Sequence, residues 1–199
     1  FIADQMRVLF AGFPIAAAKT GMLGGTDQVR AVVETWKQLG HGRIPLVVDP
    51  VMVATSGGRL LEDAAVRTLI DELLPLATLI TPNMDEAKVL WERDVSTLDD
   101  MEACARELSA RFDAAVLVKG GHLQGDAADV LYHDGEIFWH TAPRTPGVHT
   151  HGTGCTFSAA IATGLAHEMG LNEAVAEAKQ FVSRAIAQHF TWQSAGAGV

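Results

Sequence analysis

Three short runs of apolar residues, separated by helical patterns, constrain the fold of this chain more than any other feature. The runs cover residues 44–49, 78–81 and 115–119, and their hydrophobic side chains follow one another without alternation. Strands that are apolar on both faces belong to a parallel sheet buried between helices. The sequence therefore predicts a layered α/β domain with a mostly parallel central sheet and helices on both faces.

The segments between these runs carry apolar residues at helical spacing. Thr97, with Asp100 three residues later, resembles a capping box at the start of one such segment. The chain also opens at Phe1, without an initiator Met, inside what reads as a running helix. Further helices are expected at residues 27–39, 60–74, 83–91, 97–112 and 172–190.

Residues 130–139 depart from this pattern. Asp134 and Gly135 lie between two β-prone runs, and an Asp-Gly pair in that position is typical of a β-hairpin. The parallel sheet is therefore expected to gain an antiparallel edge. We find no linker or internal repeat, and 199 residues suit one sizeable core, so residues 1–199 are expected to form a single domain.

Composition excludes several classes of function. The formal net charge of -9 and the lack of a basic run argue against a nucleic-acid partner. No apolar run is long enough for a membrane span and no signal peptide is visible, so a cytoplasmic protein is expected. Cys104 lies on an apolar helical stripe, which predicts a buried thiol, and no paired cysteines indicate zinc.

A glycine-rich turn precedes the helical run that contains Phe157, Ile161 and Leu165. The turn reads Gly152-Thr153-Gly154-Cys155. Free backbone N–H groups and the helix dipole make such a helix start a binding place for a phosphate, and they favour the thiolate of a cysteine there. The turn matches neither the Walker pattern nor the dinucleotide fingerprint, and the alternative is that it only makes a tight corner.

Polar residues also stand where the expected strands end. Ligands of open α/β sheets bind at the carboxyl ends of the strands, and here these ends hold residues 19–22, 49–52, 81–86 and 119–122. Their carboxylates and lysines, with the glycine-rich turn, form the set of groups that phosphoryl transfer needs. Lys119 follows four apolar residues, so its ammonium is expected to point at a ligand.

Each of these strand-end residues also has a purely structural interpretation. Asp49 precedes Pro50 and can simply start a turn. Asn83 can serve only as a helix cap, and Glu86 only as the partner of that cap three residues on.

The order and spacing of six stretches resemble the hydroxymethylpyrimidine kinase / phosphomethylpyrimidine kinase family of thiamin biosynthesis, within the ribokinase-like superfamily. The resemblance implies a three-layer fold and ATP-dependent phosphorylation of 4-amino-5-hydroxymethyl-2-methylpyrimidine, then of its monophosphate to the diphosphate, with Mg²⁺. The stretches are residues 19–23, 48–57, 79–87, 116–122, 141–144 and 150–158.

The resemblance also implies roles for individual residues. The anion hole around the transferring phosphoryl group corresponds to Gly152, Thr153, Gly154 and Cys155. The positions that handle magnesium correspond to Asp49 and Glu86, with Asn83 beside them. Lys119 matches a lysine on the ATP phosphates, and the nucleotide is bordered by Thr150 and Lys179. The pyrimidine is bordered by Gly21, Met22 and Val51. Cys155 can accept the hydroxyl proton, or contact the substrate instead.

The sequence departs from the family pattern at both ends. The family begins with a further strand and a glycine-rich segment and ends in a Gly-Pro-containing tail, so residues 1–199 are expected to lack the N-terminal strands and the extreme C-terminal tail. A pyridoxal kinase of the same branch and a non-catalytic pyrimidine-binding module stay open as alternatives. Relatives are often dimers, so a homodimer is allowed, with the small-molecule substrate and ATP as the other partners.

Overall fold

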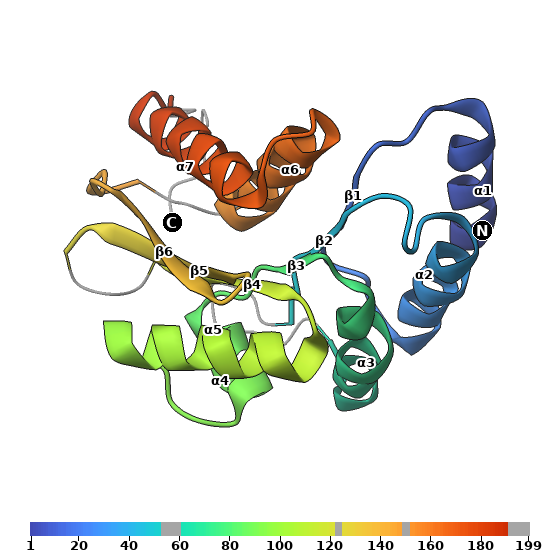
Figure 1. The fold of residues 1–199 in the computed structure, drawn as a ribbon, viewed down its shortest axis with the longest axis horizontal. Coiled ribbons are helices and arrows are strands. Elements are labelled where there is room, and N and C mark those ends of the chain that lie inside the picture. Colours follow the sequence, from blue (N-terminus) through green and yellow to red (C-terminus); the bar gives the residue numbers. More distant parts are fainter. Residues whose placement is uncertain (53–60, 122–124, 149–151, 191–199) are drawn as a thin grey trace, which may run out of the picture.

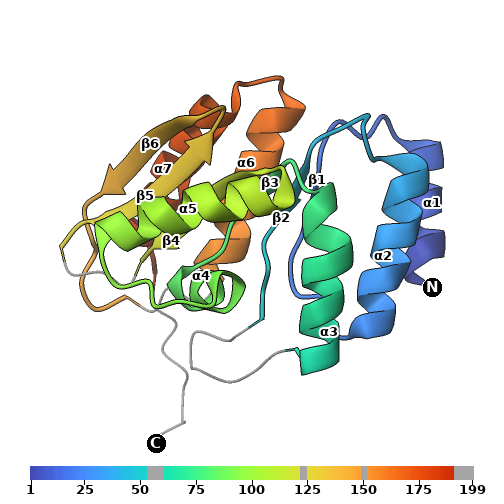
Figure 2. The same ribbon diagram turned by 60° about the horizontal axis from the view of Figure 1, so that its bottom comes forward.

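A single mixed sheet of six strands lies between two layers of helices (Figures 1 and 2). The computed structural model describes residues 1–52, 61–121, 125–148 and 152–190. Strands β1 to β4 are parallel and β5 and β6 are antiparallel, which confirms the mostly parallel α/β sheet. In spatial order they are β1 (Ala18–Thr20), β2 (Leu46–Val48), β3 (Leu79–Ile80), β4 (Ala115–Gly120), β5 (Ala127–His133) and β6 (Glu136–Ala142).

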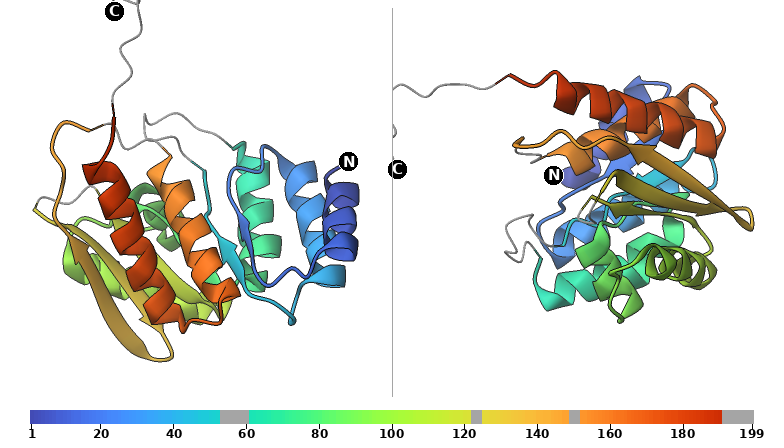
Figure 3. Two further views of the ribbon diagram at one scale, coloured as in Figure 1. Left: turned by 90° about the horizontal axis from the view of Figure 1, so that it is seen from above. Right: turned by 90° about the vertical axis from the view of Figure 1, so that its left-hand side faces the viewer.

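Helices cover both faces of the sheet. Helices α6 (Thr153–Ala166) and α7 (Leu171–Ala187) run side by side across one face (Figure 3). The core on the opposite face is built from α2 (Thr26–Leu39), α3 (Asp63–Thr68), α4 (Met84–Trp91) and α5 (Leu98–Phe112). Helix α1 (Ile2–Gly12), expected where the chain opens, packs on α2 and buries no residue fully. The three-layer arrangement is therefore as predicted.

The alternation of side chains along the parallel strands separates the two cores. Val47 of β2 packs with Leu79, Leu117 and residues of α6 and α7. Its neighbours Leu46 and Val48 pack on the other face, with α2 to α5. Since successive residues of a strand point to opposite faces, the residue two places after Val47 points toward α6 again. This periodicity positions the site described below.

The hairpin prediction is confirmed, and the strands are longer than expected. Asp134 and Gly135 both have positive φ, 50° and 84°, as the favoured two-residue hairpin turn requires. Strand β5 begins at Ala127, three residues before the run of β-prone side chains. That extension places Asp129 directly opposite Lys119 of β4.

One helix prediction is wrong in detail. The single helix expected over residues 60–74 is instead α3, then a π-helical turn, η1 (Leu69–Leu73), then a 3-10 turn, η2 (Leu74–Leu76). Pro75 explains the break, because it has no N–H to donate and its ring clashes with the carbonyl of the preceding turn. The capping box of Thr97 and Asp100 is present at the start of α5.

The thiol of Cys104 is fully buried, as predicted, and burial raises its pKa to about 12. Among the residues that the structure describes, no helix combines the length and the apolar character needed to cross a membrane.

Candidate active site

The carboxyl ends of the parallel strands place polar side chains beneath the start of α6. Two residues after the apolar positions that face α6, the strands carry Asp49, Thr81 and Lys119. The hydroxyl of Thr81 donates to Asp49 Oδ1 at 3.3 Å, and the hydroxyl of Ser158 on α6 donates to Asp49 Oδ2 at 3.4 Å. The strand ends therefore form one connected polar group.

An ion pair lies at the centre of this group. The ammonium Nζ of Lys119 lies 2.7 Å from Oδ1 of Asp49, and the two side chains are 13% and 2% exposed. Charges this deeply buried require a partner. Asp49 therefore does more than start a turn, although the N–H of Val51 does donate to its carbonyl oxygen at 2.9 Å.

The glycine-rich turn opens directly onto this ion pair. Gly152 caps α6 with a φ of 83°, a left-handed conformation that favours glycine. A Cβ placed on Gly154 would lie 3.3 Å from Lys119 Nζ and 3.8 Å from Asp49 Oδ2. The backbone of the first turn of α6 therefore approaches both charges without a side chain in between. Free N–H groups, the helix dipole and an ammonium converge there, which is chemistry suited to a phosphate.

Asn83 and Glu86 form the capping box that opens α4. The side chain of Asn83 accepts from the N–H of Glu86, and Glu86 Oε2 accepts from the N–H of Asn83, both at 2.9 Å. The backbone of Asn83 also forms an isolated parallel β-bridge with that of Lys119 in β4. The structural interpretation of both residues is thus correct, and their position beside Lys119 leaves a ligand role open.

Glu86 is a buried carboxyl with an altered pKa. Its side chain is 2% exposed, and burial raises its pKa to about 7, against the lowering effect of the Lys119 charge, while the charge of Asp49 adds to the rise. Mg²⁺ is usually held by one or two carboxylates together with phosphate oxygens and water. Asp49 and Glu86 fit that donor set. Within the described ranges no cluster of three or more potential metal ligands occurs.

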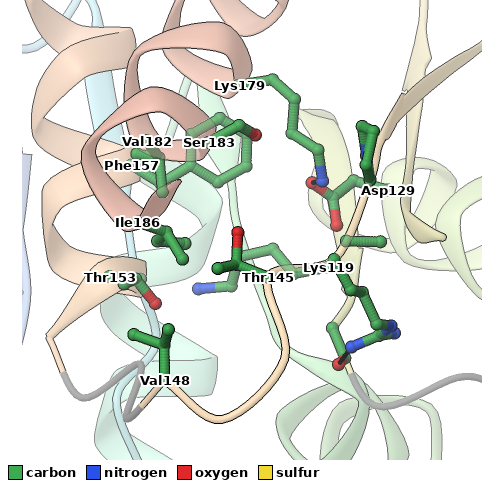
Figure 4. A pocket seen from close by; sticks show the side chains of 15 residues that line it. Lys119, Asp129, Thr145, Val148, Thr153, Phe157, Lys179, Val182, Ser183 and Ile186 are labelled. Atoms are coloured by element: carbon green, nitrogen blue, oxygen red, sulfur yellow. Dashed lines mark hydrogen bonds and ion pairs between the residues drawn. The ribbon is translucent and has the colours of Figure 1, made fainter. Parts of the chain in front are cut away.

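A cavity of about 310 Å³ adjoins the start of α6 (Figure 4). Of the residues expected in the site, it brings together Lys119, Thr153, Gly154 and Lys179. Figure 4 shows Lys179 reaching from α7 toward Asp129. Lys179 Nζ lies 2.7 Å from Asp129 Oδ2, and Asp129 Oδ1 accepts from the N–H of Gly120 at 3.0 Å. Two lysines, each paired with a carboxylate, therefore lie on its walls.

Two charged residues of the cavity lining, Asp129 and Arg144, were not predicted as site residues. Asp129 is 4% exposed and fixes Lys179. A lone carboxylate before the apolar run of β5 is the signal that could have found it. Arg144, within a stretch that carried the resemblance, donates to the carbonyl oxygens of Gly120, Gly121 and Gly125 at the rim.

The other expected residues that the structure describes lie outside the cavity lining. Cys155 is an exposed free thiol, and its Sγ lies 3.7 Å from where a Cβ on Gly21 would stand. Met22 is 62% exposed and Val51 is half-buried. Thr150, expected to border the nucleotide, lies outside the described residues.

Comparison with known proteins identifies the family. The family model described as phosphomethylpyrimidine kinase matches residues 1–198. The chain belongs to the phosphomethylpyrimidine kinase family. It is 43% identical over 187 residues to the hydroxymethylpyrimidine/phosphomethylpyrimidine kinase of Rhizobium meliloti, covering 93% of this chain and 69% of that protein. It is 42% identical to the thiamine biosynthesis bifunctional protein ThiED of Geobacter sulfurreducens, covering 94% of this chain and 38% of that longer protein.

Solved structures with the same fold include a pyridoxal kinase and a phosphomethylpyrimidine kinase. The ADP complex of Bacillus subtilis pyridoxal kinase superposes with a TM-score of 0.82 at 36% identity, covering 96% of this chain and 70% of the other. The phosphomethylpyrimidine kinase of Clostridium difficile gives a TM-score of 0.80 at 34% identity, covering 92% and 74%. The fold and the family are those of phosphotransferases.

Proposed function

We propose that the intact protein phosphorylates 4-amino-5-hydroxymethyl-2-methylpyrimidine with ATP and then converts the monophosphate to the diphosphate. The observation that carries this proposal is the Lys119–Asp49 pair beneath the open helix start at Gly154, where Lys119 lines a cavity that Lys179 also lines. The relatives named above for this activity support the choice of substrate.

The residues of the site suit a loose phosphoryl-transfer transition state, which requires in-line positioning and charge stabilisation. The N–H groups of residues 152–155 and the ammonium of Lys119 would bind the equatorial oxygens of the transferring group. Lys179 and Thr150 would border the rest of the nucleotide. Magnesium would offset phosphate charge when bound, and Asp49 and Glu86, with Asn83 beside them, are the residues proposed to hold it, largely through water.

The acceptor would lie on the far side of the helix start from the cavity. Gly21, Met22 and Val51 are proposed to border the pyrimidine. Cys155, whose Sγ lies close to Gly21, is proposed to accept the proton of the hydroxymethyl group during the first transfer. A contact to the substrate without proton transfer is the alternative role for this thiol.

Pyridoxal phosphorylation is the second candidate function. Cys155 is exposed and free, so its thiol can add to the aldehyde of pyridoxal, and solved pyridoxal kinases share the fold. The deciding experiment compares kcat/KM of the intact protein with MgATP on the pyrimidine alcohol and on pyridoxal. Preference for the pyrimidine supports our proposal. Preference for pyridoxal supports the second candidate, and ATP binding without turnover on either supports a non-catalytic module.

We also expect that residues 1–199 form a single domain, that the protein can form a homodimer and that it is cytoplasmic.

A further inference from the structure

Lys19 lies in β1, two residues before Gly21, and the sequence predicts no individual role for this lysine in the site. It pairs in register with Val47 of β2, so its side chain lies on the face covered by α6. Its Nζ lies 3.1 Å from the point where a Cβ on Gly21 would stand, and Cys155 Sγ lies 3.7 Å from the same point. The ammonium of Lys19 and the thiol of Cys155 are therefore close neighbours over Gly21.

Lys19 differs from the other two lysines of the site in having no carboxylate partner among the residues that the structure describes. Lys119 and Lys179 each lie 2.7 Å from a buried aspartate. Lys19 is half-buried, and it makes no hydrogen bond or ion pair with any residue in the described ranges 1–52, 61–121, 125–148 and 152–190. A half-buried ammonium beside a helix start is available to pair with an incoming anion.

Lys19 and Lys119 lie on different sides of the start of α6. Lys119 approaches Gly154 and lines the cavity. Lys19 is absent from that lining and approaches the next residue, Cys155, beside Gly21. Lys119 therefore lies beside the cavity proposed for the nucleotide, and Lys19 lies on the side proposed for the acceptor.

We propose that Lys19 binds the phosphate of the monophosphate acceptor in the second phosphoryl transfer. This inference rests on the proposed function. In the first transfer the acceptor is a neutral alcohol, whereas in the second it brings a phosphate of nearly two negative charges close to the triphosphate. An oxygen of the acceptor phosphate forms a bond to the γ-phosphorus as the bond from that phosphorus to the bridging oxygen breaks and ADP leaves with the electron pair. Lys19 offsets the repulsion between the two anions.

The test is to measure kcat/KM of the intact protein separately for the alcohol and for the monophosphate. A charge-assisted hydrogen bond is worth a factor of about 10 to 100. Lys19→Met is therefore expected to lower kcat/KM for the monophosphate at least about tenfold more than for the alcohol, and Lys19→Arg to recover part of the loss. Lys37→Met, at an exposed lysine of α2, is the matched control. Equal losses on both acceptors, or none, would overturn the proposal.

Calorimetric binding of the two acceptors without ATP separates this proposal from the proposed function. If the wild type turns over neither acceptor, the proposed function fails. The role of Lys19 is still supported if the wild type binds the monophosphate more tightly than the alcohol and Lys19→Met abolishes this preference. The same preference in wild type and Lys19→Met, or no preference in the wild type, would contradict that role.

Discussion

Lys119 of β4 reaches across β3 to Asp49 at the end of β2, with its Nζ 2.7 Å from Oδ1 of the carboxylate. The same ammonium lies 3.3 Å from the position of a Cβ on Gly154. One cation thus pairs with the carboxylate at the end of β2 and lies close to the start of α6. A phosphate group that enters between them would meet a charge already fixed in place, so little reorganisation would accompany the transfer.

The first prediction concerns Asp49. In Asp49→Asn the buried ammonium of Lys119 loses its charge partner, and such losses destabilise a protein by about 3 kcal/mol or more. If Asp49 also holds magnesium, the concentration of Mg²⁺ needed for half-maximal activity should rise at least about tenfold. Thermal unfolding and magnesium titration of the activity check both effects. Asp85→Asn, at an exposed carboxylate in the first turn of α4, should show neither effect. An unchanged magnesium requirement in Asp49→Asn would remove Asp49 from the metal site.

Gly154 provides a test of the open helix start. In Gly154→Ala the new methyl group occupies the space 3.3 Å from Lys119 Nζ, where an oxygen of the transferring group would bind. We expect kcat to fall about 100-fold, while stability is kept or raised because alanine is the better helix former. Gly12→Ala, where a Cβ would meet no described atom within 4 Å, is the control for stability. Full activity in Gly154→Ala would show that phosphate binds elsewhere.

The raised pKa of Glu86 leads us to expect that the stability of the metal-free protein depends on pH. Its pKa of about 7 in the folded state exceeds the ordinary 4.5, so the folded state holds the proton more tightly than the unfolded state does. Both states are protonated below pH 4.5. Between pH 4.5 and 7 the unfolded state loses its proton while the folded state keeps it, so about 3 kcal/mol of stability is lost as the pH rises to the folded pKa, and no more is lost above it.

Glu86→Gln isolates this effect, because glutamine can still accept the N–H of Asn83 and keep the capping box. The free energy of unfolding of the variant relative to the wild type should rise between pH 4.5 and 7 and then level off. Urea denaturation across that range, with the exposed Glu34→Gln as the control, measures the difference. Parallel curves would mean that Glu86 has an ordinary pKa.

A substitution of Cys155 distinguishes proton transfer by its thiol from a simple contact with the substrate. Cys155→Ala should lower kcat on the pyrimidine alcohol about 100-fold, the usual contribution of a general base, with a much smaller change in the Kd of ATP. The monophosphate acceptor is already ionised and hardly needs a base, so its kcat should fall less. Rapid-quench kinetics on both acceptors measure the difference. An equal fall on both acceptors would favour the contact role.

The sequence predicts most of the fold because its signals are local. Continuous apolar runs, helical periodicity and the Asp134–Gly135 turn each specify an element without reference to distant residues. The break after Thr68 was missed because the periodicity of the apolar residues continues through it, although Pro75 forbids a regular helix.

The site was predictable wherever a strand end determined it. Asp49 and Lys119 follow apolar strands, and the rule for parallel sheets places them together. Asp129 was not predictable in that way, because it lies inside an antiparallel strand and its role depends on Lys179, 50 residues further along the chain. The position of Lys19 was visible in the sequence. Its lack of a partner within the described part of the chain was not, since pairing is a property of the assembled sheet.

The most direct test of the proposed function is phosphorus NMR of the intact protein with MgATP and 4-amino-5-hydroxymethyl-2-methylpyrimidine. We predict a phosphomonoester resonance that appears first and is then replaced by the paired resonances of a diphosphate ester, with one ADP formed at each transfer. ADP accompanied only by inorganic phosphate, or ATP that stays intact while the pyrimidine is present, would contradict the proposal.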